Sequence, residues 1–229
     1  MEDAYDMFKR SETNPALVDS RGNVPLPLVQ LSRCFWGETF GMIVELKDNI
    51  GREISRGSLS WSTSSAYGWH DRRICSLIGG TDGYAAVHYS MFYKAIQAKL
   101  KVSFVSPDDD LEEDRQVCGR IYTRYTKYRY FTRHDKIYQS VLFEKHKSKR
   151  VSLRGGDLIA LSKDVVAVPS DVFLIVKVDL RVFVDGKCVE KLRGKVSFEP
   201  KEPQKPKPKS LPQSIRGSVY GIQVSVEWG

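Results

Sequence analysis

The stretch from Asp171 to Phe198 constrains the fold of this chain more than any other. Its first half has an apolar residue at every even position, and charged residues occupy several odd positions between them. Alternation with a period of two is typical of a strand that buries one face. The apolar even positions are Val172, Leu174, Val176, Val178, Leu180, Val182 and Val184. The segment therefore predicts a long strand, which needs a second layer to cover its apolar face.

Asp185 and Gly186 follow this strand and predict a hairpin turn. The returning strand keeps its apolar residues on even numbers, at Cys188, Leu192, Val196 and Phe198. A two-residue turn would pair even positions with odd ones and bury the cations of the returning strand. We therefore expect a three-residue loop, Val184 to Gly186, with Gly186 in the left-handed conformation of a bulge. That register pairs Val182 with Cys188, Val178 with Leu192, and Leu174 with Val196.

Short apolar or alternating segments recur along the chain, and no segment shows convincing helical periodicity. One of the clearest strands is 95–105, which has one apolar and one polar face. Further strands are expected at 36–47, 52–56, 77–78, 84–89, 121–131, 137–143, 151–153, 158–161, 165–168 and 220–228. Many short strands separated by turn signals predict an all-β fold, mainly an antiparallel β-sandwich or open barrel with long hairpins.

Composition divides the chain into a tail and a domain. Residues 1–28 mix charges with Pro and Gly and have no sustained period, which predicts a flexible N-terminal tail. Residues 29–229 are expected to form a single β-rich domain. Within it, residues 200–212 alternate Pro and Lys, which favours an extended loop. This loop is not a domain boundary, because the strand that follows it needs a sheet.

Charge and cysteine content limit the compartment and the partners. The net charge of +8 permits an anionic partner without requiring one. We expect no signal peptide, because the first residues are acidic and lack an apolar core, and no apolar run is long enough for a membrane span. The four cysteines are scattered and form no CxxC pair, which predicts a cytoplasmic or nuclear protein. We expect neither a metal nor another cofactor.

The most suggestive segment for function is 119–133, in which cations interleave with aromatic residues. Aromatic rings can stack on bases while neighbouring cations hold phosphates, so this pattern predicts a nucleic-acid site. Its candidate residues are Arg120, Tyr122, Arg124, Tyr125, Lys127, Tyr128 and Arg129. A purely structural interpretation is also open, because tyrosine favours strands, and arginine and lysine stems pack across its ring.

Other chemically suggestive residues favour structural roles. His70, Asp71 and Cys75 lie close in sequence, but adjacency does not supply the geometry of a base, an acid and a nucleophile. Gly79–Gly83 lacks the Gly-Lys-Ser/Thr ending of a phosphate-binding loop and is expected to be a turn. Gly155 and Gly156 likewise predict a turn. We therefore predict that the chain is not an enzyme.

Five stretches carry a resemblance to a known family. In chain order they are FGMIVELKDNIGREI, SLIGGTDGY, AIQAKLKV, VSLRGGDLIALSKDVVAVPS with the hairpin after it, and YGIQVSVEW. Together, over about residues 31 to 228, they resemble the plant domain-of-unknown-function family 6598, which is abundant in grasses. The resemblance implies a β-rich fold. In some proteins that domain accompanies a ribosome-inactivating rRNA N-glycosylase domain, including jasmonate-induced ones.

The resemblance carries no catalytic residues to this chain. The paired tyrosines and the helix with Glu and Arg that form the glycosylase site have no counterpart in this sequence, so the toxin activity is not expected here. Together these observations predict a non-enzymatic interaction domain, linked to stress or defence, with a protein as its partner. Two alternatives are nucleic-acid or ribosome binding through the basic aromatic residues, and a viral or assembly structural protein.

Overall fold

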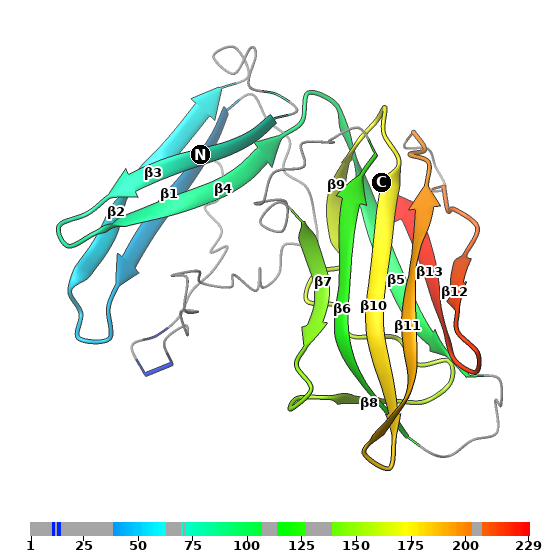
Figure 1. Cartoon of the computed structure of the whole chain (residues 1–229). Coiled ribbons are helices and arrows are strands. Elements are labelled where there is room, and N and C mark those ends of the chain that lie inside the picture. The colour runs from blue at the N-terminus through cyan, green and yellow to red at the C-terminus, as the bar shows by residue number, and fades with distance from the viewer. Residues whose placement is uncertain are drawn as a thin grey trace. The chain divides into compact units, whose positions relative to one another are not determined.

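A computed structural model describes residues 11, 13–14, 39–62, 70, 72–106, 114–126, 139–202 and 208–229. Every regular element within these residues is a strand (Figure 1). The strands form two compact units, one ending at Tyr93 and the other beginning at Lys94. The single domain expected over residues 29–229 stays a prediction. The expected tail, residues 1–28, lies almost entirely outside the described residues.

The first unit consists of two antiparallel hairpins. One joins β1 (Thr39–Lys47) to β2 (Glu53–Ser62), and the other joins β3 (Arg72–Gly79) to β4 (Tyr84–Met91). In the first turn, the Asp48 carboxylate accepts hydrogen bonds from the backbone N–H groups of Ile50 and Arg52, each at 2.9 Å. In the second turn, the Gly80 N–H donates to the Gly83 carbonyl at 2.9 Å. Both turns are confirmed at their predicted positions, although β3 is longer than the expected strand 77–78.

The two hairpins meet through β2 and β3. The Ser55 hydroxyl is buried and donates to the Ile78 carbonyl at 2.7 Å. A Cβ atom at Gly80 would lie 2.3 Å from the Ile54 carbonyl oxygen, so the backbones approach too closely there for any side chain. Glycine at this position is therefore a packing requirement as well as a turn signal.

The second unit is an antiparallel β-sandwich of two sheets. One sheet has the order β11-β10-β6-β7, with β8 also paired to β6, and the other has the order β12-β13-β5-β9 (Figure 1). The strands are β5 (Ala95–Val105), β6 (Arg115–Tyr125), β7 (Ser140–Lys145), β8 (Val151–Leu153), β9 (Val165–Pro169), β10 (Leu174–Val184), β11 (Lys187–Phe198), β12 (Gln213–Arg216) and β13 (Gly221–Trp228). The predicted all-β, antiparallel sandwich fold is confirmed.

The core of the sandwich lies between the two sheets. β5 and β13 alternate buried and exposed residues, as their sequence pattern predicts. The largest fully buried side chains include Trp228, Phe104, Phe198 and Leu180, and burying each such side chain contributes about 2 kcal/mol. The Trp228 indole N–H is satisfied by the Ser210 hydroxyl at 2.9 Å. This hydrogen bond ties the end of β13 to the residues that precede β12.

The register predicted for the long hairpin is wrong. Asp185 and Gly186 form a two-residue turn with φ values of 49° and 74°, and Val184 pairs with Lys187. These positive φ values are what a tight hairpin turn requires. The pairing then shifts, because Phe183 lies opposite Cys188 whereas Val182 lies opposite Glu190.

The shift leaves Val189 as one extra residue in the returning strand, a bulge that restores the pairing of even with even positions. Leu180 therefore pairs with Leu192, and Val176 with Val196. The prediction that Leu192, Val196 and Phe198 face the core is confirmed. Cys188, also expected on that face, is exposed.

The predicted and observed strands differ at two further places. The expected strand 158–161 is represented only by an isolated bridge between Ser103 and Leu158. The short edge strand β12 was not expected at all. Its ladder is supplemented by Gln213, whose side-chain amide accepts from the Ser197 N–H at 3.3 Å and donates to the Ser197 carbonyl at 2.6 Å. Gln213 thus connects β12 to the edge of β11 in the opposite sheet.

Candidate anion-binding sheet face

The basic aromatic residues predicted from sequence divide between the two faces of β6. Val117, Ile121 and Thr123 are buried in the interior of the sandwich, whereas Arg120 and Tyr122 are partly exposed on the outer face. Alternation along a strand sends neighbouring side chains to opposite sides, so a run of adjacent cations and rings cannot form one surface. Lys127, Tyr128 and Arg129 lie outside the described residues.

Tyr125 belongs to the inner face. It packs against the core, and its hydroxyl donates a hydrogen bond to the Ala167 carbonyl of β9 in the opposite sheet. This side chain therefore helps to hold the two sheets together. It is not positioned to stack on a base at the outer surface.

Tyr122 lies on the outer face between two arginines. The Arg120 guanidinium carbon lies 5.1 Å from the centroid of the Tyr122 ring, and that of Arg124 lies 5.5 Å from it. Arg120 is also an ion-pair partner of Glu144, with 3.7 Å between Nε and Oε1. The amide oxygen of Gln139, in the orientation that satisfies its neighbours, accepts from Arg124 Nε at 3.1 Å. The structural interpretation, in which arginine side chains pack across tyrosine rings, thus accounts for part of the composition of segment 119–133.

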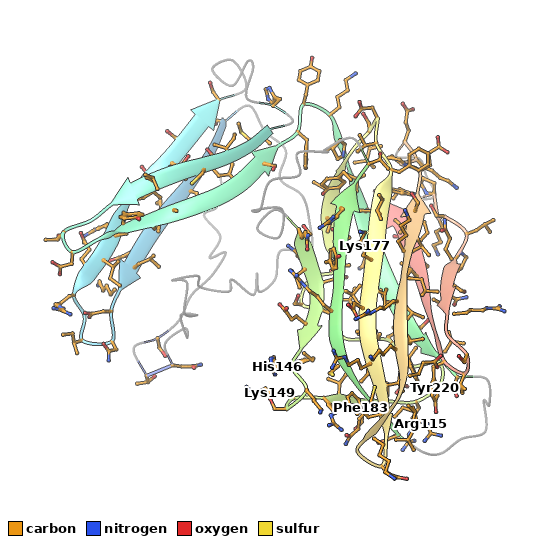
Figure 2. All side chains as sticks on the ribbon, in the orientation of Figure 1. Arg115, His146, Lys149, Lys177, Phe183 and Tyr220 are labelled. Carbon is orange, nitrogen blue, oxygen red and sulfur yellow. The ribbon has the colours of Figure 1, made fainter. Side chains whose placement is uncertain are left out.

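Strand pairing extends the outer face beyond β6. Lys177 of β10 lies opposite Tyr122 on one side and opposite Lys195 of β11 on the other. Four residues along β10, Arg181 lies opposite Lys191. We define the cationic face as the outward residues Arg120, Tyr122, Arg124, Glu144, Lys177, Asp179, Arg181, Lys191, Arg193 and Lys195 of β6, β7, β10 and β11. Figure 2 shows Lys177 on this sheet.

Positive charge exceeds negative charge on the cationic face. Seven cations stand against the two carboxylates of Asp179 and Glu144, a net charge of +5. The Asp179 carboxylate accepts from Arg193 Nε at 3.0 Å, and Glu144 pairs with Arg120. Both carboxylates therefore pair with arginines in one row across the sheet, which consists of Glu144, Arg120, Asp179 and Arg193. This row lies between the two like-charged pairs, Lys177 with Lys195 and Arg181 with Lys191.

The crowding of cations is visible in the pKa of Lys177. Burial lowers this pKa below the ordinary value of 10.5, and the positive charges of Arg124 and Lys195 lower it further. Like charges directly opposite each other on paired strands are destabilising. A bound anion between these cations would relieve the repulsion.

One end of the same sheet face is covered rather than open. Phe183 is only 2% exposed, because the Arg150 guanidinium carbon lies 3.8 Å from the centroid of its ring. Arg150 Nη1 also donates to the Gln116 side-chain oxygen at 3.1 Å. Arg150 is thus engaged in covering the sheet, and the cationic face ends at Arg181 and Lys191.

Gly119 allows β6 and β10 to pair closely beneath the cationic face. Its φ of 125° is rarely adopted by other residues, and an added Cβ atom would lie 2.2 Å from the Asp179 carbonyl oxygen. Neither Gly119 nor the cations of β10 and β11 stood out in the sequence as candidate site residues. The alternation of charge in 171–198 was visible in sequence, but the partner of each cation depends on register.

The other sequence candidates do not form a site among the described residues. The His70 ring meets the Tyr93 ring edge-on, with 5.7 Å between the centroids, and Asp71 is not described. The described residues contain no group of three or more His, Cys, Asp or Glu that could hold a metal ion. In the part of the chain that the structure describes, no helix is long and apolar enough to cross a membrane.

Comparison with known proteins agrees with the resemblance seen in the sequence. The model of a domain of unknown function, DUF6598, matches residues 3–226. No curated protein and no solved structure matches the chain. Because the family match covers nearly the whole sequence, the chain belongs to the DUF6598 family, whose function is uncharacterised.

Proposed function

We propose that this chain is a non-enzymatic interaction domain that binds an acidic segment of a partner protein on its cationic face. The observation that carries the proposal is the pair of like-charged rows, Lys177 with Lys195 and Arg181 with Lys191, on one side of one sheet. That the chain is not an enzyme rests on its sequence, which offers no convergent set of acid, base and nucleophile.

Electrostatic complementarity supports an anionic partner. Opposed cations cost stability in the isolated protein, and a face of one sign attracts a partner of the opposite sign over several ångströms. The two carboxylates of the face are already paired with Arg193 and Arg120. A bound segment that brings its own carboxylates would therefore meet cations that lack a carboxylate directly opposite them in the sheet.

The spacing of the cations suits an extended acidic polypeptide. Lys191, Arg193 and Lys195 occupy alternate positions of β11, so their Cα atoms lie roughly 7 Å apart along the strand. Alternate side chains of an extended peptide recur at the same spacing. A segment with Asp or Glu at every second position could therefore place several carboxylates against these cations.

The aromatic side chains of this region favour a polypeptide over single-stranded nucleic acid. Stacking of bases requires exposed ring faces. Tyr125 points into the core, and guanidinium groups of Arg120 and Arg124 lie near the Tyr122 ring. The observed geometry thus offers a ligand more opportunity for ionic contacts than for stacking on aromatic rings.

We extend the proposal to a stress or defence setting in the cytoplasm or nucleus of a plant cell. This part of the proposal rests on the presence of similar domains beside ribosome-inactivating N-glycosylase domains in some plant proteins. The acidic partner would then belong to that response, and the chain would act by recruitment.

Fluorescence anisotropy tests the binding proposal. A labelled peptide of alternating Glu and Ser and a labelled single-stranded RNA are titrated with the protein at about 50 mM and about 200 mM salt. We expect the peptide to bind more tightly than the RNA and to weaken as salt rises. The variant Lys177→Glu/Lys195→Glu is expected to weaken peptide binding by about tenfold or more, because attraction becomes repulsion.

Lys101→Glu/Lys99→Glu provides a matched control, because both lysines are exposed on β5 in the opposite sheet. This control changes the net charge equally and should retain binding within about twofold if the cationic face is specific. An equal loss of peptide affinity in both double variants would contradict the assignment of binding to the cationic face. Tighter, salt-dependent binding of RNA would instead support the nucleic-acid alternative and overturn the choice of a protein partner.

A further inference from the structure

We propose that the cationic face holds one phosphorylated serine or threonine of its acidic partner between Lys177, Lys195 and Arg124. Such a site rests on the proposed function and makes it more specific, because it names a chemical group of the partner and the residues that bind this group. The three cations come from β10, β11 and β6. A phosphorylated side chain carries a charge of about −2 at neutral pH and three strong acceptor oxygens.

Strand register brings the three cations together. Lys177 lies directly opposite Lys195, and residues opposed in this way have Cβ atoms about 5 Å apart. Arg124 lies opposite Ile175, two residues before Lys177, so it is a diagonal neighbour of that lysine. Burial lowers the pKa of Lys177 most, and the positive charges of Arg124 and Lys195 lower it further. All three cations therefore act on the same small area of the sheet.

Neither of the two rows that hold these cations contains a carboxylate in the described part of the sheet. One row consists of Val141, Tyr122, Lys177 and Lys195, and the next consists of Arg124, Ile175 and Ser197. Asp179 lies in the row on the other side, where its carboxylate is paired with Arg193 Nε at 3.0 Å. Glu199 lies beyond the end of β11, about 13 Å along the chain from Lys195. Three positive charges thus meet with no carboxylate between them.

The other like-charged pair, which contains Arg181, has a different neighbour on β6. The diagonal neighbour of Arg181 is Arg120, and an ion pair with Glu144 compensates the charge of Arg120. The partner of Arg124, in contrast, is the neutral side-chain amide of Gln139. An uncompensated third cation therefore accompanies only one of the two like-charged pairs of the cationic face, and this difference gives the phosphate its position.

A phosphate monoester matches this cluster better than a carboxylate does. A carboxylate carries one negative charge, whereas a doubly charged phosphate compensates two of the three cations. Its three oxygens can accept charge-assisted hydrogen bonds from more than one ammonium or guanidinium group. The carboxylates of the acidic segment would then meet the other cations of the face. Phosphorylation of the partner is therefore expected to raise its affinity.

Fluorescence anisotropy with three labelled peptides tests the phosphate site. The first is the peptide of alternating Glu and Ser, the second carries phosphoserine at its central serine, and the third carries Glu at that position. We expect phosphoserine to tighten binding by about tenfold and Glu by about twofold. The advantage of phosphoserine should shrink as pH falls from about 7.5 to about 5.5, because the phosphate gains a proton with a pKa of about 6. An equal gain from phosphoserine and Glu, or a gain that does not change with pH, would overturn the phosphate site.

Two double variants locate the phosphate on the cationic face. Lys177→Gln/Lys195→Gln should remove most of the advantage of phosphoserine over serine. Arg181→Gln/Lys191→Gln is the matched control, because it removes the same charge from the other like-charged pair. This control should weaken both peptides and keep the ratio of their affinities within about twofold of the original. Circular dichroism verifies that each variant is folded, and equal ratios in the two variants would contradict the assignment to Lys177 and Lys195.

The same peptides separate the phosphate site from the proposed function. If the unphosphorylated peptide binds and phosphoserine adds nothing, the phosphate site is wrong and the binding of an acidic segment stands. If only the phosphopeptide binds, the phosphate site stands and the acidic residues are not sufficient for recognition. If neither peptide binds, both proposals are overturned.

Discussion

Lys177 and Lys195 lie directly opposite each other on β10 and β11, at the centre of the cationic face. The pairing is a consequence of the bulge at Val189, which brings odd positions of β10 opposite odd positions of β11. Without the bulge, each cation of β11 would lie opposite a core-facing residue of β10 and would itself point into the core. The same irregularity thus protects the core and concentrates positive charge on the other face.

We predict that Lys195→Glu stabilises the protein but weakens its binding to an acidic peptide. The change replaces an opposed like-charged pair with an ion pair and should add about 0.5 kcal/mol to the free energy of unfolding. Because the pKa of Lys177 is lowered in the folded protein, its charge opposes folding at neutral pH, and that penalty disappears as pH rises through the lowered pKa. The stabilisation by Lys195→Glu should therefore be larger at neutral than at strongly alkaline pH, as thermal denaturation would reveal. If Lys195→Glu neither stabilised the protein nor weakened peptide binding, the importance of this pair would be contradicted.

Substitution of Glu190 should destabilise the sandwich in a pH-dependent way. Glu190→Gln weakens the acceptor of three backbone N–H groups and should cost about 1–2 kcal/mol at neutral pH. The folded pKa of Glu190 lies below its ordinary value, so its contribution is present above that value and is lost as pH falls through the folded pKa. Urea denaturation at several pH values should show the original protein and the variant converging in acid. A constant difference between them at every pH would count against this role of the carboxylate.

Gly119→Ala should be one of the most destabilising single substitutions in the second unit. It combines a strained φ of 125° with a contact of 2.2 Å to the Asp179 carbonyl oxygen, and we expect a loss of about 3 kcal/mol or more. Gly156→Ala separates the two causes, because Gly156 has a φ of 85° but open space around a Cβ atom. This control should cost only about 1 kcal/mol. Chemical denaturation measures both, and equal effects would show that the close approach to β10 is unimportant.

Tyr125→Phe and Tyr122→Phe should behave differently, because the two rings lie on opposite faces of β6. Removal of the Tyr125 hydroxyl leaves the partly buried Ala167 carbonyl without that donor and should cost about 1 kcal/mol of stability. Peptide binding should not change. Tyr122→Phe should leave stability within about 0.5 kcal/mol, since the change retains the ring between Arg120 and Arg124. If Tyr125→Phe weakened binding without affecting stability, the assignment of faces would be incorrect.

The sequence alone determined the fold class, most strands, the turns at Asp48, Gly80 and Asp185, and the buried face of 171–198. These features depend on local alternation and on residues that favour tight turns, both of which are legible within a few positions. The sequence also contained the signals of the DUF6598 family. It did not reveal β12, because a four-residue strand at an edge has too few residues to show a period.

Which cations share a surface depends on how the strands pair in the folded protein. The basic aromatic run looked like one site in sequence, but Tyr125 points inward, and the neighbours of Arg120 and Tyr122 come from β10 and β11. The register that creates this surface depends on Val189, whose role as an extra residue has no local signal. Alternation within a strand tells which side chains share its face, but contact between strands depends on pairing across many residues, and a single bulge changes every pair beyond it.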